Sequence, residues 1–374
     1  MGMQLDNACA HSGHQRGSFA RRPVSLNRRR ALRGSLGLLA AAGGIYAPPA
    51  VAEDLLPRTD LDKLYDRDVD LAIRRGLNYL MKSQKEDGTF QSREQGRWVG
   101  VVSLVGLGFL SRGVRCGVGR AGQVLQRAGE YVLSQVQASG FVSAAGQTSH
   151  GPMYDHGFGT LFLSELYGMA PQLEIRPKLE KAVRLIARTQ NKNGGWRYNP
   201  APPSQADLSV TVCQMMALRA ARNAGFGVPK QIIDRSVDYV RRSQNSDGGY
   251  MYQLSGGASR FPITAAAVVA LYNAGIYEGP EIEAATKFLE GNAEGNMRVE
   301  RNNFYFYAHY YSAQAFWHRG GKAWENWYGQ LKRALLNSQK QQGSWFDFNS
   351  AEYGTAMACL ILNMPRTVLP IFQK

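Results

Sequence analysis

Five titratable side chains recur along the chain at one fixed place, three or four residues before a small hydroxyl residue. They are His156, Asp207, Arg260, His309 and Glu352. The hydroxyl residues that follow them are Thr160, Thr211, Thr264, Ser312 and Thr355. Residues at that spacing share one face of an α-helix, so the pattern predicts a polar collar at one level of a ring of helices. Neighbouring unlike groups push each other's pKa values apart, which suits general acid–base chemistry.

The collar supplies two sets of candidate site residues. The candidate catalytic residues are Asp207, His156, Asp155, His309 and Glu352, with an aspartate as proton donor and a histidine as base. The candidate ligand contacts are Tyr154, Thr160, Thr211, Arg260, Thr264, Tyr307, Tyr311 and Thr355. A structural interpretation stays open for both sets. The hydroxyls can bond carbonyls four residues back, Asp207 can cap its own helix, and Arg260 can pair with Asp207.

Two other features bear on the type of ligand. Arginines occur in four of the loops that would meet at the collar, which favours an anion such as a diphosphate or a carboxylate. They are Arg93 and Arg97, Arg197, Arg260, and Arg298 with Arg301. Eight aromatic residues gather between Phe304 and Trp317, and aromatic faces can stabilise a carbocation. Scattered surface charge and ordinary core packing are the respective alternatives. No spacing typical of a metal or cofactor site occurs, and the three cysteines after Cys9 lie far apart in the chain.

The elements that must hold this collar repeat along the chain. A signature of Gln, three residues, Gly, one residue and an aromatic occurs four times. The copies are Gln84-Gly88-Phe90, Gln190-Gly194-Trp196, Gln244-Gly248-Tyr250 and Gln339-Gly343-Trp345. The two long gaps between them contain degenerate copies, one at Gln135 or Gln137 with Gly140, and one at Asn292 with Gly295. Six copies of one supersecondary unit follow from this spacing.

Each unit predicts a helical hairpin. An amphipathic helix, for example Glu180 to Gln190, runs up to the Gln, and Gly ends it in a conformation that Gly adopts at low cost. The following helix, for example Val210 to Ala221, is apolar nearly all round and must be buried on every side. Six alternating pairs of this kind predict an all-α (α/α)6 toroid, a closed barrel of six helical hairpins.

The signature resembles the QW repeat of squalene–hopene and oxidosqualene cyclases, and the toroid is similar to that of protein prenyltransferase β-subunits. The resemblance spans about residues 60 to 374. It implies a terpenoid-cyclase fold with an isoprenoid-type substrate or ligand. The same fold carries several chemistries, so the resemblance alone does not assign a reaction.

The known active residues of both groups are missing here. Class II cyclases resemble one another in an Asp-x-Asp-Asp run whose central Asp protonates the substrate. In this chain Asp207 matches the first position, while Ser209 and Val210 stand at the last two. Prenyltransferase β-subunits hold zinc with an Asp, a Cys and a His, and Gly354 stands where that His would be. The chain therefore reads as a divergent member with neither site.

The N-terminal segment predicts an exported protein. Residues 1–52 read as a twin-arginine signal, with Arg28 and Arg29 before an apolar run and Ala50-Val51-Ala52 for cleavage. Residues 53–66 read as a linker and residues 67–374 as a single toroid domain. The location expected is the periplasm or cell surface, with no stable membrane span. Six of the fifteen net positive charges lie in the first 52 residues, and the rest are scattered, which argues against nucleic-acid binding.

Three functions remain open at this stage. The favoured one is a toroid that binds an apolar or isoprenoid-type small molecule in its central cavity. The alternative is a divergent terpene-cyclase-like or other enzyme that uses the collar. The third is a protein-interaction scaffold, for which the sequence names no partner.

Overall fold

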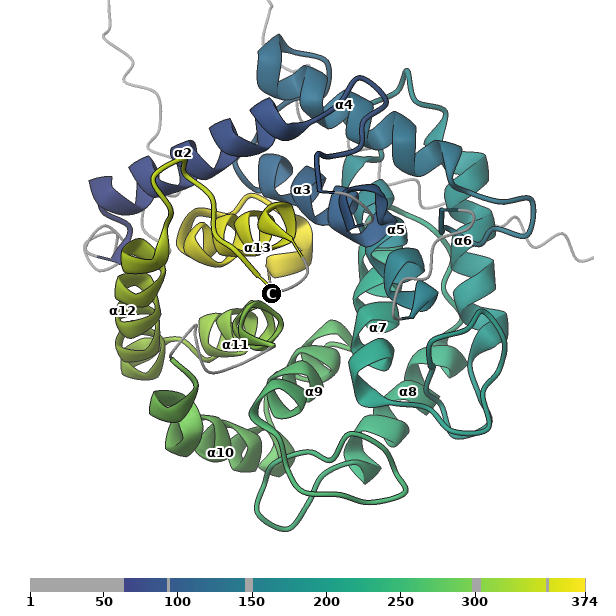
Figure 1. Ribbon diagram of the computed structural model, residues 1–374. Coiled ribbons are helices and arrows are strands. Elements are labelled where there is room, and N and C mark those ends of the chain that lie inside the picture. The colour runs from purple at the N-terminus through teal and green to yellow at the C-terminus, as the bar shows by residue number, and fades with distance from the viewer. Residues whose placement is uncertain (1–63, 93–94, 145–150, 298–303, 348–349, 374) are drawn as a thin grey trace, which may run out of the picture. The chain divides into compact units, whose positions relative to one another are not determined.

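Twelve α-helices among the described residues form two concentric rings in the computed structural model (Figure 1). The structure describes residues 64–92, 95–144, 151–297, 304–347 and 350–373. The inner ring consists of α3 (Val99–Ser111), α5 (Pro152–Leu166), α7 (Leu208–Asn223), α9 (Phe261–Asn273), α11 (Tyr305–Arg319) and α13 (Ala351–Leu362). The outer ring consists of α2 (Arg67–Ser83), α4 (Gly119–Ser134), α6 (Ile175–Thr189), α8 (Lys230–Arg242), α10 (Pro280–Asn296) and α12 (Gly321–Ser338). The predicted all-α (α/α)6 toroid is confirmed.

The inner ring is closed, because each inner helix contacts the next and α13 contacts α3. The outer helices α4, α6, α8, α10 and α12 each contact the inner helix that precedes them in the chain, α2 contacts α13, and α12 also contacts α2. These helices belong to one compact unit, Leu56–Lys374; the other unit, Met1–Leu55, lies outside the described residues. The predicted signal and most of the predicted linker therefore lie outside them too. At the end of that linker, Tyr65 is buried and Asp66 caps α2.

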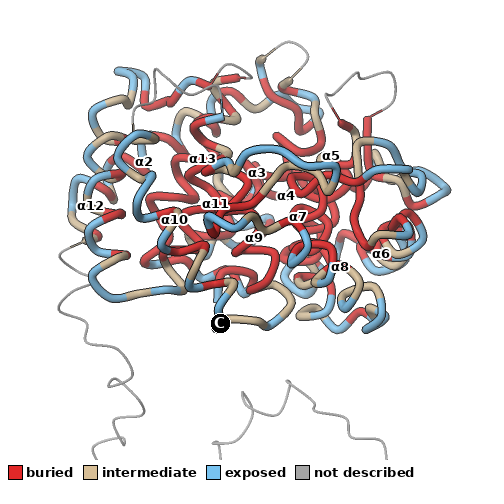
Figure 2. The backbone as a smooth tube through the Cα atoms, turned by 90° about the horizontal axis from the view of Figure 1, so that it is seen from below, coloured by how far each residue is buried: buried red, intermediate tan, exposed pale blue. Residues whose placement is uncertain are grey.

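Burial separates the two rings as the sequence pattern predicts. All residues of α3 are buried, and α5, α7, α9 and α13 are buried nearly all round. The outer helices bury one face only, as in α8, where Ser236, Tyr239 and Val240 are the buried residues. Figure 2 shows this as a buried centre with exposed helices around it. Burial of the apolar inner helices on all sides supplies the main driving force for the fold.

In the four complete copies of the signature, the Gln joins one outer helix to the next. The Gln190 Nε2 donates to the carbonyl oxygen of Gly194 in its own turn, at 2.9 Å, and to that of Ile232 on α8, at 2.8 Å. The other three copies make the same pair of bonds, to Val124 on α4, Glu281 on α10 and Ala72 on α2. One amide group thus satisfies a carbonyl of its own turn and gives an additional hydrogen bond to a carbonyl of the next outer helix.

The Gly and the aromatic of the signature have separate structural roles. Gly194 has a φ of 96°, and a Cβ there would lie 2.0 Å from the Arg235 carbonyl oxygen of the next outer helix. Only Gly accepts both the backbone conformation and the close approach. Trp196 is fully buried, and its indole N–H donates to the Ile186 carbonyl oxygen at 2.8 Å.

The two degenerate copies differ in outcome. Gly140 keeps a φ of 88° and lies against the Lys181 carbonyl oxygen of α6, so the second turn is present. The predicted turn at Asn292 and Gly295 is wrong, because both residues lie inside α10, which runs to Asn296. The Asn292 side chain bonds the Phe288 carbonyl of its own helix, so no amide there reaches α12.

The chain ends in a segment that covers one end of the barrel. After α13, a short 3₁₀ turn, Met364–Arg366, leads to residues 367–373, which we term the strap. The strap contains a second 3₁₀ turn, Pro370–Phe372. Figure 1 shows the C-terminus at the centre of the ring. The Val368 N–H donates to the carbonyl oxygen of Ser111, the last residue of α3. The strap therefore lies at the end of the barrel where the inner helices finish.

Candidate active site

Three of the predicted collar hydroxyls hold the repeat turns. The Oγ1 atoms of Thr211, Thr264 and Thr355 accept hydrogen bonds from backbone N–H groups at 3.1, 2.9 and 3.0 Å. Those N–H groups belong to Trp196, Tyr250 and Trp345, the aromatics of the preceding signatures. The structure thus gives these hydroxyls a structural partner.

Both collar histidines also hydrogen-bond to backbone groups outside their own helices, His156 as an acceptor and His309 as a donor. The His156 Nδ1 accepts the Val142 N–H at 3.1 Å, and the His309 Nε2 lies 3.0 Å from the Asn296 carbonyl oxygen at the end of α10. His156 therefore occupies in α5 the place that Thr211 occupies in α7, and the sequence alignment of α5 was four residues out of register. Burial lowers the pKa of His156 to about 3 and that of His309 to about 4, so both are neutral near pH 7. Thr160, one turn farther along, is buried in α5.

Asp155 hydrogen-bonds to the start of the first inner helix, and Glu352 hydrogen-bonds to the loop before that helix. The Asp155 Oδ1 accepts the Gly100 N–H at 2.8 Å, at the beginning of α3. The Glu352 Oε2 accepts a hydrogen bond from the Ser92 hydroxyl, in the loop before α3. Both carboxyl groups are buried, and their described bonds connect neighbouring hairpins.

Asp207 differs from the other four. It is the N-cap of α7, where its Oδ1 accepts the Val210 N–H at 2.9 Å and the Ser209 hydroxyl at 2.6 Å. Its side chain is completely buried. Burial raises the pKa of Asp207 despite the hydrogen bonds from Ser209, Val210 and Tyr252 and the attraction of Arg197. Burial thus favours the neutral form of this carboxyl group, and its hydrogen bonds favour the carboxylate.

A polar group surrounds Asp207 at the mouth where the inner helices begin. We define the Asp207 cluster as Asp207, Ser209, Tyr154, Tyr198 and Tyr252. The Tyr154 hydroxyl donates to Ser209 Oγ at 2.6 Å, and the hydroxyls of Tyr198 and Tyr252 are hydrogen-bonded to each other.

Two arginines flank this cluster over aromatic faces. The guanidinium of Arg197 lies 5.6 Å from the ring centroid of Tyr198, and that of Arg260 lies 5.8 Å from that of Tyr252. Arg260 is exposed and caps α9. Its described contact is thus with Tyr252 rather than with Asp207. Arg93, Arg298 and Arg301, three other predicted loop arginines, lie outside the described residues.

Aromatic rings occupy the barrel axis below the cluster. The rings of Phe158 on α5 and Tyr310 on α11 are 6.1 Å apart between centroids, although these helices lie on opposite sides of the ring (Figure 1). Tyr307 and Tyr311, two predicted ligand contacts, are 4.9 Å apart. Their buried hydroxyls have no hydrogen-bond partner in the described part of the chain. Tyr307 also lies near enough to Asp207 for the aspartate charge to raise the pKa of its phenol.

Sequence reasoning missed several residues of this site. In the sequence, Ser209 stands out only because it occupies the position of an acid in the class II cyclase run. In the structure, the Ser209 hydroxyl donates a hydrogen bond to the acid that is present, Asp207. Tyr198 and Tyr252 each lie two residues after a signature aromatic, and that common offset was the available signal. Glu165 is a further buried carboxyl, and it was detectable as the one charged residue in the apolar stretch from Phe158 to Tyr167.

The described residues contain neither a cluster of metal ligands nor a membrane-spanning helix. No group of three or more His, Cys, Asp or Glu side chains there could hold a metal ion. None of the helices described is long and apolar enough to cross a membrane.

Comparison with known proteins gives a consistent fold. No family model matches the chain. A drimenyl diphosphate synthase from Streptomyces showdoensis is 38% identical over 71 residues, which is 19% of this chain and only 12% of the synthase. The type II terpene cyclase MstE from Scytonema, solved with its substrate geranylgeranyl dihydroxybenzoate, has a TM-score of 0.57 at 16% identity. That match covers 83% of this chain and 99% of the cyclase.

The same architecture occurs in enzymes with other names. A GH76 α-mannanase from Bacteroides thetaiotaomicron has a TM-score of 0.56 at 12% identity, and the match covers 80% of this chain and 96% of the mannanase. At identities this low, structural similarity identifies the fold and leaves the activity to be argued from the site. The chain has the all-α toroid fold of type II terpene cyclases.

Proposed function

We propose that this chain is a terpene-cyclase-like enzyme in which Asp207 protonates an isoprenoid-type substrate. The observation that carries the proposal is the state of the Asp207 carboxyl: fully buried, with a raised pKa, and close to the tyrosines of the barrel axis. A protonated acid in a dry, aromatic-lined place is what the protonation of a carbon–carbon double bond requires.

The step balances without a cofactor. Asp207 gives its proton to one alkene carbon, and the positive charge appears on the neighbouring carbon. The Val210 N–H, the Ser209 hydroxyl and Tyr252 stabilise the carboxylate that is left behind. Faces of Tyr154, Tyr307 and Tyr311 can stabilise the cation through the ring quadrupole. Loss of a proton from the cation to Asp207 or to water completes an isomerisation or cyclisation.

The comparisons favour this chemistry over that of the other toroids. MstE binds a geranylgeranyl substrate, and the short curated match is to a drimenyl diphosphate synthase. The Gln–Gly–aromatic turns, which resemble the QW repeat, also favour terpene-cyclase chemistry. The acid would differ from that of the class II cyclases it resembles, because Asp207 stands at the first position of their run and Ser209 supports it.

The test is turnover by the purified chain with prenyl diphosphates and prenyl alcohols of increasing length. We expect Asp207→Asn to abolish product formation and to keep the fold, since Asn also caps helices well. Asp234→Asn, on the exposed face of α8, is the matched control and should retain turnover. Equal turnover in wild type and Asp207→Asn would reject Asp207 as the acid.

A second candidate is binding of an isoprenoid-type molecule without reaction. It is favoured by the tyrosine-rich axis, which offers aromatic surface with few charges. Mass spectrometry of an organic extract from native-source protein tests it directly. A stoichiometric lipid together with no turnover would support a carrier, and an empty extract with no turnover would argue against both candidates.

We also propose that the protein is exported, on the strength of the N-terminal signal alone. A reporter fused to residues 1–66 should leave the cytoplasm only when Arg28 and Arg29 are intact. Equal export after both are changed to Lys would contradict the assignment.

A further inference from the structure

The two oxygens of the Asp207 carboxyl have different surroundings. Oδ1 accepts the Val210 N–H at 2.9 Å and the Ser209 hydroxyl at 2.6 Å. Oδ2 is buried and lacks a well-formed hydrogen bond among the described residues. If Asp207 is the acid of the proposed function, Oδ2 is therefore the oxygen free to carry the proton that it gives away. Oδ1 is the oxygen that can receive a proton through Ser209.

A chain of two hydroxyl groups leads to Oδ1. The Tyr154 hydroxyl donates to Ser209 Oγ at 2.6 Å, and the Ser209 hydroxyl donates to Oδ1 of Asp207, also at 2.6 Å. Both hydrogens point toward the aspartate, so the Tyr154 oxygen can accept another proton on its lone pairs. These two bonds keep the Tyr154 oxygen within about 5 Å of Oδ1.

Tyr154 faces the barrel axis near its mouth. It lies four residues before Phe158 on α5, and residues at that spacing share one helix face. The Phe158 ring meets the Tyr310 ring across the axis, with 6.1 Å between centroids, so this face points inward. From the facing helix α11, the Tyr307 phenol lies within electrostatic range of Tyr154. The Tyr154 oxygen thus lies where a substrate in the mouth of the barrel would meet it.

The collar histidines and Glu165 are less well placed to take a proton from such a substrate. His156 bonds the turn that follows the outer helix α4. The His309 ring lies against Trp327 of the outer helix α12, with 5.7 Å between centroids. These contacts hold both imidazoles toward the outer layer of the barrel. Glu165 lies three turns after Tyr154 on α5, about 16 Å along the helix.

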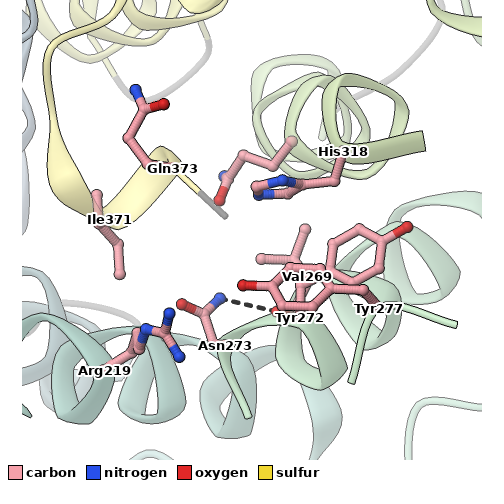
Figure 3. A pocket seen from close by; sticks show the side chains of 9 residues that line it. Arg219, Val269, Tyr272, Asn273, Tyr277, His318, Ile371 and Gln373 are labelled. Atoms are coloured by element: carbon pink, nitrogen blue, oxygen red, sulfur yellow. Dashed lines mark hydrogen bonds between the residues drawn. The ribbon is translucent and has the colours of Figure 1, made fainter. Parts of the chain in front are cut away.

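A substrate would bind at the mouth rather than at the strap end. The hollow described at the strap end is about 10 Å³, which is room for about one water molecule. It lies between the strap and the ends of α7, α9 and α11, and its walls include Arg219, His318 and Ile371 (Figure 3). A space of that size excludes an isoprenoid chain, so the mouth with Asp207 is the end that a substrate approaches.

On the basis of the proposed function, we propose that Tyr154 is the catalytic base that ends the reaction and that Ser209 passes the proton back to Asp207. Asp207 first protonates the substrate from Oδ2, which leaves a carboxylate and a carbocation. Tyr154 then takes a proton from the carbon next to the cationic centre, and the electrons of the broken C–H bond form the new double bond. In the same step the former Tyr154 proton moves to Ser209, and the Ser209 proton moves to Oδ1 of Asp207.

This return relay of Tyr154 and Ser209 restores the acid without water or a cofactor. Each hydroxyl gains one proton as it loses another, so neither becomes charged. A phenolate is thus never formed, which fits Tyr154, because burial raises the pKa of its phenol well above the ordinary value. The carbocation is neutralised, and Asp207 is ready for the next substrate molecule.

The short distance between acid and base limits the product. The proton enters and leaves the substrate beside one carboxyl group. The contact between Phe158 and Tyr310 closes the axis one turn below Tyr154, about 6 Å deeper. Only one end of an isoprenoid chain reaches both groups, so we expect a shifted double bond or a single new ring. Either product has the mass of its substrate, and a fused polycyclic skeleton is not expected.

Rapid-quench kinetics of the full chain, with geranylgeraniol and geranylgeranyl diphosphate as probes, test the relay. We expect the wild type to turn over many molecules at one steady rate. Tyr154→Phe keeps the ring and removes the hydroxyl, so it should consume about one equivalent of probe per chain near the wild-type rate and then slow at least about tenfold. Ser209→Ala should behave in the same way. Ser209→Thr, which keeps a hydroxyl, should restore steady turnover.

Tyr167→Phe is the matched control. Tyr167 ends the same helix α5, far from Asp207, and its hydroxyl accepts a hydrogen bond from Arg176. Its loss should leave the kinetics as in the wild type. Mass spectrometry and NMR of the wild-type product measure its mass and count its rings.

Three outcomes would overturn the relay alone. Equal steady turnover in Tyr154→Phe and wild type would show that another group returns the proton, while an inactive Asp207→Asn would still identify the acid. Loss of the first phase in both Tyr154→Phe and Ser209→Ala would place the hydroxyls in the protonation step instead. A polycyclic or hydrated product would show that the proton leaves elsewhere. Failure of the wild type to consume either probe would count against the proposed function as well as the relay.

Discussion

Individual buried side chains determine how the stability of this protein changes as the pH falls. His156 and His309 have pKa values lowered by burial, so the folded state holds them neutral. Each takes up a proton on unfolding once the pH falls below about 6.5, its value in an unfolded chain. Their contribution to stability is complete above that pH and is lost as the pH falls toward the lowered values. Glu165 has the opposite sign, because its raised pKa makes it bind a proton on folding.

We therefore predict a pH dependence that one substitution makes steeper. Near pH 5.5 each unmatched proton changes the free energy of unfolding by about 1.4 kcal/mol per pH unit. In the wild type, the proton that Glu165 binds on folding offsets the proton that one of the two histidines releases on folding. Glu165→Gln should remove that offset and nearly double the fall in stability between pH 7 and pH 5. Urea unfolding at pH 7, 6 and 5 measures it, and equal slopes in both proteins would contradict these assignments.

At the scale of the helical hairpin, the repeated Gln carries structure rather than chemistry. The Gln190 amide donates to two carbonyls and to the Ser236 hydroxyl, all in buried or half-buried positions. Removing it leaves the Gly194 carbonyl without its described donor, and such a buried group costs about 1–3 kcal/mol. The Ile232 carbonyl keeps the Ser236 hydroxyl as a donor. The degenerate copy at Asn292 is exposed and bonds only its own helix among the described contacts.

We predict that Gln190→Ala lowers the free energy of unfolding by about 1–3 kcal/mol, because the Gly194 carbonyl loses its donor. Asn292→Ala, the matched change in the degenerate repeat, should alter it by less than about 0.5 kcal/mol. Chemical denaturation of the two variants under one condition makes the comparison. Similar losses in both would mean that the Gln bonds are not what joins the outer helices.

The hairpins were predictable because helix periodicity and turn signals are local. The (α/α)6 fold, the alternation of apolar and amphipathic helices and the degenerate turn at Gly140 all follow from spacing along the chain. The fifth turn was misplaced because Gly295 is tolerated inside α10, where a helix interior overrides a turn signal at modest cost.

The site was less predictable than the fold. Whether a residue caps a helix, holds a turn or faces the axis depends on the register between helices, and a four-residue error moved His156 into the collar. Asp207 and Glu352 lie four and three residues before their hydroxyls, Thr211 and Thr355, yet one caps its own helix and the other bonds a distant loop. The meeting of Phe158 and Tyr310 across the axis has no signature in either local segment.

At the scale of the whole molecule, one bond of the repeated kind closes the ring. The Gln339 Nε2 donates to the Ala72 carbonyl oxygen at 2.9 Å, across 267 positions of sequence. Unlike its equivalents, this bond joins two hairpins that no loop connects. We predict that Gln339→Ala speeds hydrogen exchange in α2 by at least about tenfold, while exchange in α8 stays as in wild type.

Gln190→Ala is the matched comparison for that measurement. It should leave α2 protected, because α2 takes no bond from Gln190. Unchanged protection of α2 in Gln339→Ala would show that helix packing alone closes the ring.

Ring closure also sets the order in which the chain can be completed. The first helix of the toroid packs against the last two, so it must wait, with an apolar face uncovered, until nearly the whole chain has been synthesised. A twin-arginine route, which the N-terminal segment predicts, carries folded chains. Closure of the ring would then act as a checkpoint for export, and chains cut before α12 should remain behind in the cytoplasm.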